Sequence, residues 1–133
     1  MQAQSLPAET GVILVDHGSK NAAANNMLLR IAQTYREVTG AAIVEPAHMV
    51  LAEPTIEQAF AKCVEQGARL VIVHPYFLSP GRHSTTDIPH LAAQAAANHP
   101  GIAYRVTEPL GLDPRLAAVI QRRVKETLDT LDR

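Results

Sequence analysis

The stretch "GVILVDHGSK", residues 11–20, decides how the chain folds. Its apolar run shows no polar alternation, which is typical of a strand covered on both faces. The run predicts a buried strand over Val12–Asp16, after which Gly18 gives the backbone the freedom to turn. Ser19 or Asn21 is suited to cap the helix that follows.

Three more strand-like runs alternate with helical patterns after this first helix, which should end at the glycine in position 40. The expected strands lie at residues 41–51, 69–78 and 102–110, and the expected helices at residues 53–67, 87–99 and 113–131. Such alternation predicts an α/β fold with a four-stranded, mainly parallel sheet and helices on both faces. Pro46 cannot donate to a ladder, so the second strand should be an edge strand or bulged.

The ends of the helices carry their own signals. Pro54 should lie near the first position of the second helix, and Gly67 should follow its end. Asp87 is suited to cap the third helix, with Pro89 in its first turn. The spacing of the last helix places five apolar residues on one face: Leu116, Val119, Ile120, Val124 and Leu128.

The 133 residues suit one domain, expected at residues 11–133 after a flexible leader at residues 1–10. A net charge of −1 without a basic stripe, and an aromatic content of 4%, argue against nucleic-acid binding. The apolar runs are too short to cross a membrane, and the first ten residues do not read as a secretory signal. Cys63 is the single cysteine, which excludes an intrachain disulfide and makes the cytoplasm the default compartment.

Polar side chains gather where two of the expected strands end. Asp16 to Lys20 follow the first strand, and "PGRHSTTD", residues 80–87, follows the third. The carboxyl ends of parallel strands share one edge, where α/β proteins bind their ligands. We therefore expect His17 and His83 on one rim, where imidazoles can bind a divalent metal, accept protons near neutral pH or contact phosphate. The alternative for His17 is a purely structural turn residue.

The other polar residues have both a functional and a structural interpretation. Those that could hold carboxylates or phosphates, or simply form a solvated surface, are Ser19, Lys20, Arg82, Ser84, Thr85 and Thr86. Candidate accessory residues are His48, Glu45 and Glu53, of which His48 could equally be a packing residue. We expect structural roles for His74, His90 and His99, and a core position for Cys63.

The motifs "VDHGS" (15–19) and "PYFLSPGRHSTTDIP" (75–89), with "VEPAHMVLAEPTIEQAF" (44–60) between them, resemble the small sirohydrochlorin chelatases. These are the single-lobe class II tetrapyrrole chelatases. The resemblance runs from about Gly11 to Thr127 and is greatest for the ferrochelatase branch that serves siroheme synthesis. It implies a chelatase-like lobe and a lyase activity that inserts Fe²⁺ into sirohydrochlorin.

The resemblance also implies roles for residues and partners. The two family histidines correspond to His17 and His83, which would bind the metal and accept the pyrrole protons. Lys20, Arg82 and the loop hydroxyls could hold some of the eight carboxylates of sirohydrochlorin. A single lobe leaves the macrocycle half covered, so the family implies a homodimer. No permanently bound cofactor and no iron–sulfur cluster are expected, and the compartment would be the cytoplasm, or the plastid stroma for a processed plant protein.

Three other functions use the same residues. Insertion of Co²⁺ for cobalamin synthesis is the main alternative, because ligand type does not separate Fe²⁺ from Co²⁺. A non-catalytic carrier of metal or tetrapyrrole would need the same groups. A histidine phosphohydrolase would carry Arg-His-Gly after its first strand, whereas Asp16 precedes the histidine here, which argues against that class.

Overall fold

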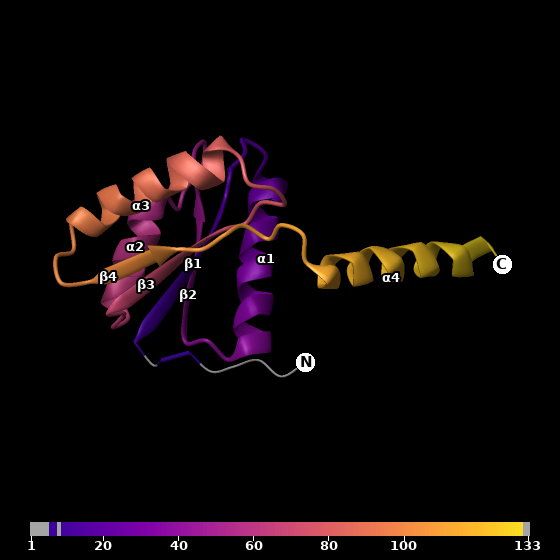
Figure 1. Cartoon of the computed structure of the whole chain (residues 1–133), viewed down its shortest axis with the longest axis horizontal. Coiled ribbons are helices and arrows are strands. Elements are labelled where there is room, and N and C mark those ends of the chain that lie inside the picture. The colour runs from indigo at the N-terminus through magenta and orange to yellow at the C-terminus, as the bar shows by residue number, and fades with distance from the viewer. Residues whose placement is uncertain (1–5, 8, 132–133) are drawn as a thin grey trace.

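The computed structural model of the chain describes residues 6–7 and 9–131. Strands and α-helices alternate throughout this part of the chain (Figure 1). The elements are β1 (Thr10–Asp16), α1 (Ala22–Thr39), β2 (Ile43–His48), α2 (Ile56–Glu65), β3 (Leu70–Pro75), α3 (Ile88–Ala97), β4 (Ala103–Val106) and α4 (Pro114–Leu131). The expected order of elements is confirmed. Of the expected leader, residues 1–5 and 8 lie outside the described residues.

The four strands form one sheet in the order β2-β1-β3-β4. Every neighbouring pair is parallel, which confirms the predicted sheet. The strand that contains Pro46 lies at the edge, as expected for a residue that cannot donate to a ladder. The chain first adds β2 on one side of β1. It then adds β3 on the other side of β1, and β4 beyond β3. The point where the order reverses therefore lies between β1 and β3.

The helix caps agree only in part with the sequence signals. The Asn21 side chain accepts a hydrogen bond from the Ala23 N–H group at the start of α1. Thr55 caps α2 in a capping box with Gln58, so Pro54 lies one residue before the cap, close to the first helical position but outside the helix. Asp87 is also not a side-chain cap, because it ends a π-helical turn, η1 (His83–Asp87), that runs directly into α3.

Two apolar cores lie on the two faces of the sheet. On one face α2 and α3 pack against β1 and β3, through residues that include Phe60, Cys63 and Ile88. On the other face α1 packs through Leu28 and Ala32 against β1 and β2. Burial of these side chains is the main force that holds the helices on the sheet.

The last helix departs from the prediction. The alternating pattern led us to expect both faces of the sheet to be covered, but α4 has no buried residue and projects away from the body (Figure 1). Its apolar residues lie in solvent, with Ile120 64% and Leu128 54% exposed. The sheet face that α1 leaves uncovered, next to β3, stays open as a consequence. None of the helices in the described part of the chain is long and apolar enough to cross a membrane.

Candidate functional site

The loops after β1 and β2 are joined beyond the ends of the two strands. The Met49 N–H group donates to the Asp16 carbonyl at 2.9 Å, and the Val50 N–H group donates to the His17 carbonyl at 3.0 Å. These bonds continue the parallel ladder past Asp16 and His48, which are paired in register. The backbone that carries His17 is therefore fixed by hydrogen bonds to the neighbouring loop and does not depend on its own short turn alone.

Gly18 makes this joining possible. Its φ of +95° lies in the left-handed region, which strains residues that carry a side chain. A Cβ atom at this position would lie 1.9 Å from the Val50 carbonyl oxygen, which is far inside van der Waals contact. The glycine after His17 is therefore required by close backbone approach as well as by the turn.

A buried histidine is hydrogen-bonded to a carboxylate directly behind the rim. The His48 Nδ1–H group donates to the Asp16 carboxylate at 2.5 Å, and the His48 side chain is only 2% exposed. His48 is thus packed at the end of β2 and paired with Asp16. Sequence analysis missed the pairing with Asp16, although both residues occupy the last position of neighbouring strands.

The His17 ring is half-buried on the rim, with Nδ1 3.1 Å from the Gly18 carbonyl oxygen. A carbonyl oxygen can only accept, so Nδ1 carries the proton in this contact. In the neutral ring, Nε2 then holds the lone pair. Nε2 is the atom that can bind a divalent metal or take up a proton.

The loop after β3 carries the second expected histidine. The backbone of His83 begins η1, and the side chains of His83 and Ser84 lie outside the described residues. Thr85 donates to the Gly81 carbonyl through both its N–H group, at 2.8 Å, and its hydroxyl group, at 2.7 Å. Half of the expected open loop is therefore a hydrogen-bonded helical turn.

Some of the expected anion-binding side chains are hydrogen-bonded within the protein, and others are exposed to solvent. Lys20, Arg82 and Thr86 are exposed, and Thr85 is exposed but already donates its hydroxyl proton to Gly81. The Ser19 hydroxyl oxygen accepts from the Asn21 N–H group at 2.9 Å, which makes Ser19 part of the turn before α1. The exposed groups follow β1 and β3, the two strands on either side of the reversal point.

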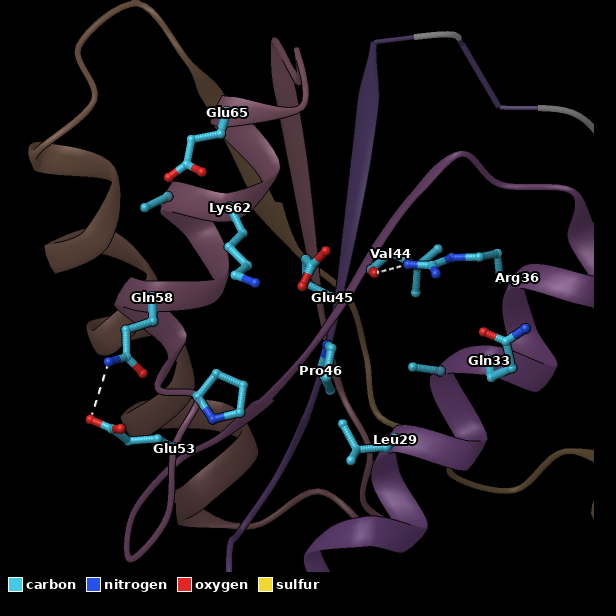
Figure 2. Close-up of a pocket in the computed structure, with 13 residues that line it drawn as sticks. Leu29, Gln33, Arg36, Val44, Glu45, Pro46, Glu53, Gln58, Lys62 and Glu65 are labelled. Atoms are coloured by element: carbon cyan, nitrogen blue, oxygen red, sulfur yellow. Dashed lines mark hydrogen bonds between the residues drawn. The ribbon is translucent and has the colours of Figure 1, made fainter.

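The two accessory glutamates line a cavity beside β2. Glu45 is paired in register with Ile13, three residues before the end of β2, and accepts from the Gln66 side chain at 2.8 Å. Glu53 accepts from Gln58 at 3.1 Å. Both line a cavity of about 810 Å³ beside the outer edge of β2, between α1 and α2 (Figure 2).

That cavity has a structural explanation. The Arg36 guanidinium donates to the Val44 carbonyl at 2.5 Å, as Figure 2 shows, and Pro46 offers no N–H group there. A strand edge with a capped carbonyl and a proline is protected against pairing with another chain. The cavity contains none of the residues at the ends of β1 and β3, so we do not place the site in it.

The cysteine and the three other histidines lie outside the two loops that follow β1 and β3. Cys63 is buried in the larger core, and burial, assisted by the charge of Glu45, raises its pKa to about 12. His74 lies 2.8 Å from the Thr107 hydroxyl, and partial burial lowers its pKa. The His99 ring stacks on Phe60, and His90 lies on the exposed face of α3.

The candidate metal-binding and anion-binding residues follow β1 and β3 at one edge of the sheet. The reversal point between β1 and β3 is where open α/β sheets form a crevice for ligands, because the flanking loops diverge to opposite faces. His17 follows β1 and His83 follows β3. Among the described residues, no three histidine, cysteine, aspartate or glutamate side chains form a metal-binding group. The His17 imidazole, with its Nε2 lone pair, is one potential metal ligand among the described residues at this edge.

Comparisons with known proteins identify the family. A family model described as CbiX matches residues 11–127. The chloroplastic sirohydrochlorin ferrochelatase of Arabidopsis thaliana is 49% identical over 92% of this chain, which spans about half (54%) of that protein. The sirohydrochlorin cobaltochelatase of Methanothermobacter thermautotrophicus is 33% identical over 89% of this chain and 92% of its own length.

A solved structure gives the same result. The cobalt complex of the sirohydrochlorin chelatase SirB from Bacillus subtilis subspecies spizizenii aligns with a TM-score of 0.82 at 30% identity, over 89% of this chain and 50% of that one. The alignment confirms the expected fold class. With the family model matching nearly the whole chain, this protein belongs to the CbiX family, whose members compared above are named sirohydrochlorin chelatases, ferrochelatases or cobaltochelatases.

Proposed function

We propose that this protein is a sirohydrochlorin ferrochelatase that inserts Fe²⁺ into the macrocycle at the edge between β1 and β3. The observation that carries the proposal is the His17 ring on this edge, with Nδ1 engaged by the Gly18 carbonyl and the lone pair therefore on Nε2. The 49% identity with a protein named as a sirohydrochlorin ferrochelatase supports iron as the metal.

The reaction makes two demands that a histidine pair can meet. A divalent ion must be held loosely enough to leave, and two pyrrole N–H protons must be removed as the ring nitrogens take the metal. Imidazole binds Fe²⁺ as a neutral ligand and accepts protons near neutral pH. We assign these roles to His17 and His83 together. The metal is a substrate that leaves with the product, so the proposal needs no resident cofactor and no iron–sulfur cluster.

The macrocycle is strongly acidic, and the edge offers groups for it. Lys20 and Arg82 are exposed cations in the loops after β1 and β3. Guanidinium and ammonium groups bind carboxylates through charge-assisted hydrogen bonds. We assign carboxylate binding to these two residues, with the hydroxyl groups of Ser84 and Thr86 as further donors, while the Thr85 hydroxyl holds the turn through Gly81. Ser19, whose hydroxyl accepts from Asn21, contributes mainly by holding the turn.

We also propose an assembly and a compartment for this protein. One lobe offers one face to a flat macrocycle, so a homodimer would enclose it from both sides. The Arabidopsis relative is named as chloroplastic, which makes the plastid stroma an alternative to the cytoplasm.

Cobalt insertion is the second candidate. The cobaltochelatase of Methanothermobacter thermautotrophicus has nearly the length of this chain, and the related structure from Bacillus subtilis is a complex with cobalt. Fe²⁺ and Co²⁺ are neighbours in the affinity order of nitrogen and oxygen sites, so the metal that is supplied can decide.

The experiment that tests the proposal is anaerobic insertion of Fe²⁺ or Co²⁺, followed by the visible spectrum of sirohydrochlorin. We expect the wild type to exceed the rate without enzyme, and His17→Ala and His83→Ala each to lose at least 100-fold in kcat. His90→Ala is the matched control, because this exposed histidine lies on α3 outside the two loops. Full activity in His17→Ala would refute the assignment, and the ratio of the two metal rates separates iron from cobalt.

A further inference from the structure

The loops on both sides of His17 carry large apolar side chains in solvent. Val50 is 41% and Leu51 58% exposed in the loop after β2, and Leu78 is 71% exposed in the loop after β3. The sheet order β2-β1-β3 places the end of β1, and therefore His17, between these two loops. Single exposed apolar residues are common in proteins, but three of them on the loops that flank one histidine indicate a binding surface.

Val50 is tied to the backbone that carries His17. Its N–H group donates to the His17 carbonyl at 3.0 Å. Its own carbonyl oxygen lies against Gly18, where an added Cβ atom would come within 1.9 Å. The exposed apolar surface therefore begins directly beside the residue that presents the imidazole.

Leu51 is held in a conformation that residues with a side chain avoid. Its φ of +71° lies in the left-handed region, where glycine and asparagine are more usual. The loop that carries it is closed at its base, because the His48 N–H group donates to the Pro54 carbonyl at 2.8 Å. An exposed leucine in this conformation adds backbone strain and little burial to the fold. Residues of this kind gather at ligand sites.

Leu78 is presented from the other side of β1. The Tyr76 N–H group donates to the Val15 carbonyl at 2.7 Å, and the Phe77 carbonyl accepts from the Leu110 N–H group at 3.0 Å. Phe77 packs against the larger core, whereas Leu78, the next residue, is exposed. The backbone before Leu78 is thus anchored to β1 and to the chain after β4, which holds this side chain at the edge of the sheet.

A tetrapyrrole has two kinds of surface. Its periphery carries carboxylates, and the two faces of its conjugated ring are apolar. The metal reaches the ring nitrogens through a face, so the ring has to turn a face toward the imidazole that delivers the ion. The edge of the sheet offers groups for both surfaces, because apolar side chains flank His17 and the exposed cations Lys20 and Arg82 follow β1 and β3.

We propose that Val50, Leu51 and Leu78 form the surface on which one face of the macrocycle lies during metal insertion. This assignment rests on the proposed chelatase function and adds the residues that position the ring. The contact is apolar, so its contribution to affinity persists when salt screens the carboxylates. It forms equally in the bound substrate and in the transition state, so it lowers KM and leaves kcat unchanged.

The first test is the dissociation constant of metal-free sirohydrochlorin, measured by fluorescence on full-length variants. Leu51→Asn removes apolar surface and tolerates positive φ, so it should raise this constant about five- to tenfold without loss of stability in urea. Leu78→Gln should weaken binding by a similar factor, and Leu51→Met should bind like the wild type. The matched control is Val38→Thr, since Val38 is 65% exposed near the end of α1, at the opposite edge of the sheet.

Salt and steady-state kinetics identify the kind of contact. In about 1 M salt the wild type should bind more weakly, because the contacts of Lys20 and Arg82 with carboxylates are screened, whereas the ratio between Leu51→Asn and the wild type should persist. In anaerobic insertion, Leu51→Asn and Leu78→Gln should raise the KM for sirohydrochlorin and keep kcat within about twofold of the wild type.

Wild-type affinity in both Leu51→Asn and Leu78→Gln would overturn the proposed surface, while metal insertion by these variants would still support a chelatase. A wild type that neither binds nor metallates sirohydrochlorin would instead overturn the proposed function, and this surface with it. Light scattering on the same samples completes the test. A loss of affinity accompanied by a change in mass would show that these residues join two chains, and would also contradict the proposal.

Discussion

At the scale of single residues, the rim is held by backbone hydrogen bonds and by a close backbone approach, which the amino-acid sequence does not indicate directly. His17 lies on the edge because Gly18 lets the Val50 carbonyl approach and because Met49 and Val50 extend the ladder past the strands. The sequence indicated that Gly18 permits a turn, but the approach of a second loop depends on contacts between distant segments. The Asp16–His48 pair was not predicted from the sequence for the same reason, because its partners are 32 residues apart in the chain.

Replacing Gly18 by alanine should destabilise the fold more than the same change at Gly40. Both glycines have positive φ, but the added Cβ atom meets the Val50 oxygen at 1.9 Å in one case and nothing within 4 Å in the other. We expect a loss of about 2–4 kcal/mol for Gly18→Ala and about 1 kcal/mol for Gly40→Ala. Urea unfolding of the two variants measures the difference, and equal losses would show that the contact with Val50 is not a constraint.

Removing the Asp16 carboxylate should leave His48 buried without its acceptor. We expect Asp16→Ala to cost about 1–3 kcal/mol in the free energy of unfolding, because a buried N–H group loses its hydrogen bond. Asp16→Asn keeps an oxygen acceptor in the same place and should cost less. If unfolding in urea gave the same stability for Asp16→Ala and the wild type, the pair would not contribute to holding the rim.

Cys63 should be unreactive in the folded protein. Its pKa of about 12 leaves almost no thiolate at pH 8, and the side chain is fully buried. An aromatic disulfide reagent should label less than a few per cent of the chains in an hour under native conditions, and all of them in guanidinium. Rapid labelling of the native protein would mean that the core around α2 opens.

At the scale of the elements, the sequence predicts strands and helices well where burial determines the pattern. The runs from Val12 to Asp16 and from Leu70 to Pro75 form strands as expected. The side chains of β1 are buried on both faces of the sheet, and those of β3 are buried on the face under α2 and α3. The errors fall at helix ends. Asp87 ends η1, which runs directly into α3, and its side chain does not cap that helix. The preceding turn is set by hydrogen bonds to the Gly81 carbonyl, which propensity does not encode.

The junction of β3 with the chain after β4 should make stability depend on pH through His74. Burial lowers its pKa below the ordinary value, partly offset by a backbone hydrogen bond with Glu108. The unfolded chain therefore binds the proton first, so stability is complete above the ordinary pKa of about 6.5 and falls as the pH drops below it. His74→Asn keeps a polar partner for Thr107 and should lose less stability than the wild type between pH 7.5 and 5. Urea unfolding at both pH values measures this loss, and equal losses in the two proteins would contradict the assignment.

At the scale of the whole molecule, the parallel α/β sheet follows from the alternating order of elements, and Pro46 indicated that β2 lies at an edge, whereas the reversal point between β1 and β3 is known only from the structure. The position of α4 does not follow from the sequence, because its amphipathic pattern requires a partner surface without specifying which chain supplies it. The candidate site was predictable as two loops on one edge, since parallel topology brings them together. Of the two accessory glutamates, Glu45 lies three residues before the end of its strand and lines the cavity beside β2.

The measurement that tests the central claim most directly is the number of turnovers by the wild-type protein. Sirohydrochlorin and Fe²⁺ are supplied anaerobically in 50-fold excess over protein, and the metallated product is counted from its visible spectrum against a control without protein. A chelatase should metallate many equivalents at a rate above the control. Product that stops at one equivalent per chain, or forms no faster than in the control while the tetrapyrrole remains bound, would contradict catalysis and leave a carrier.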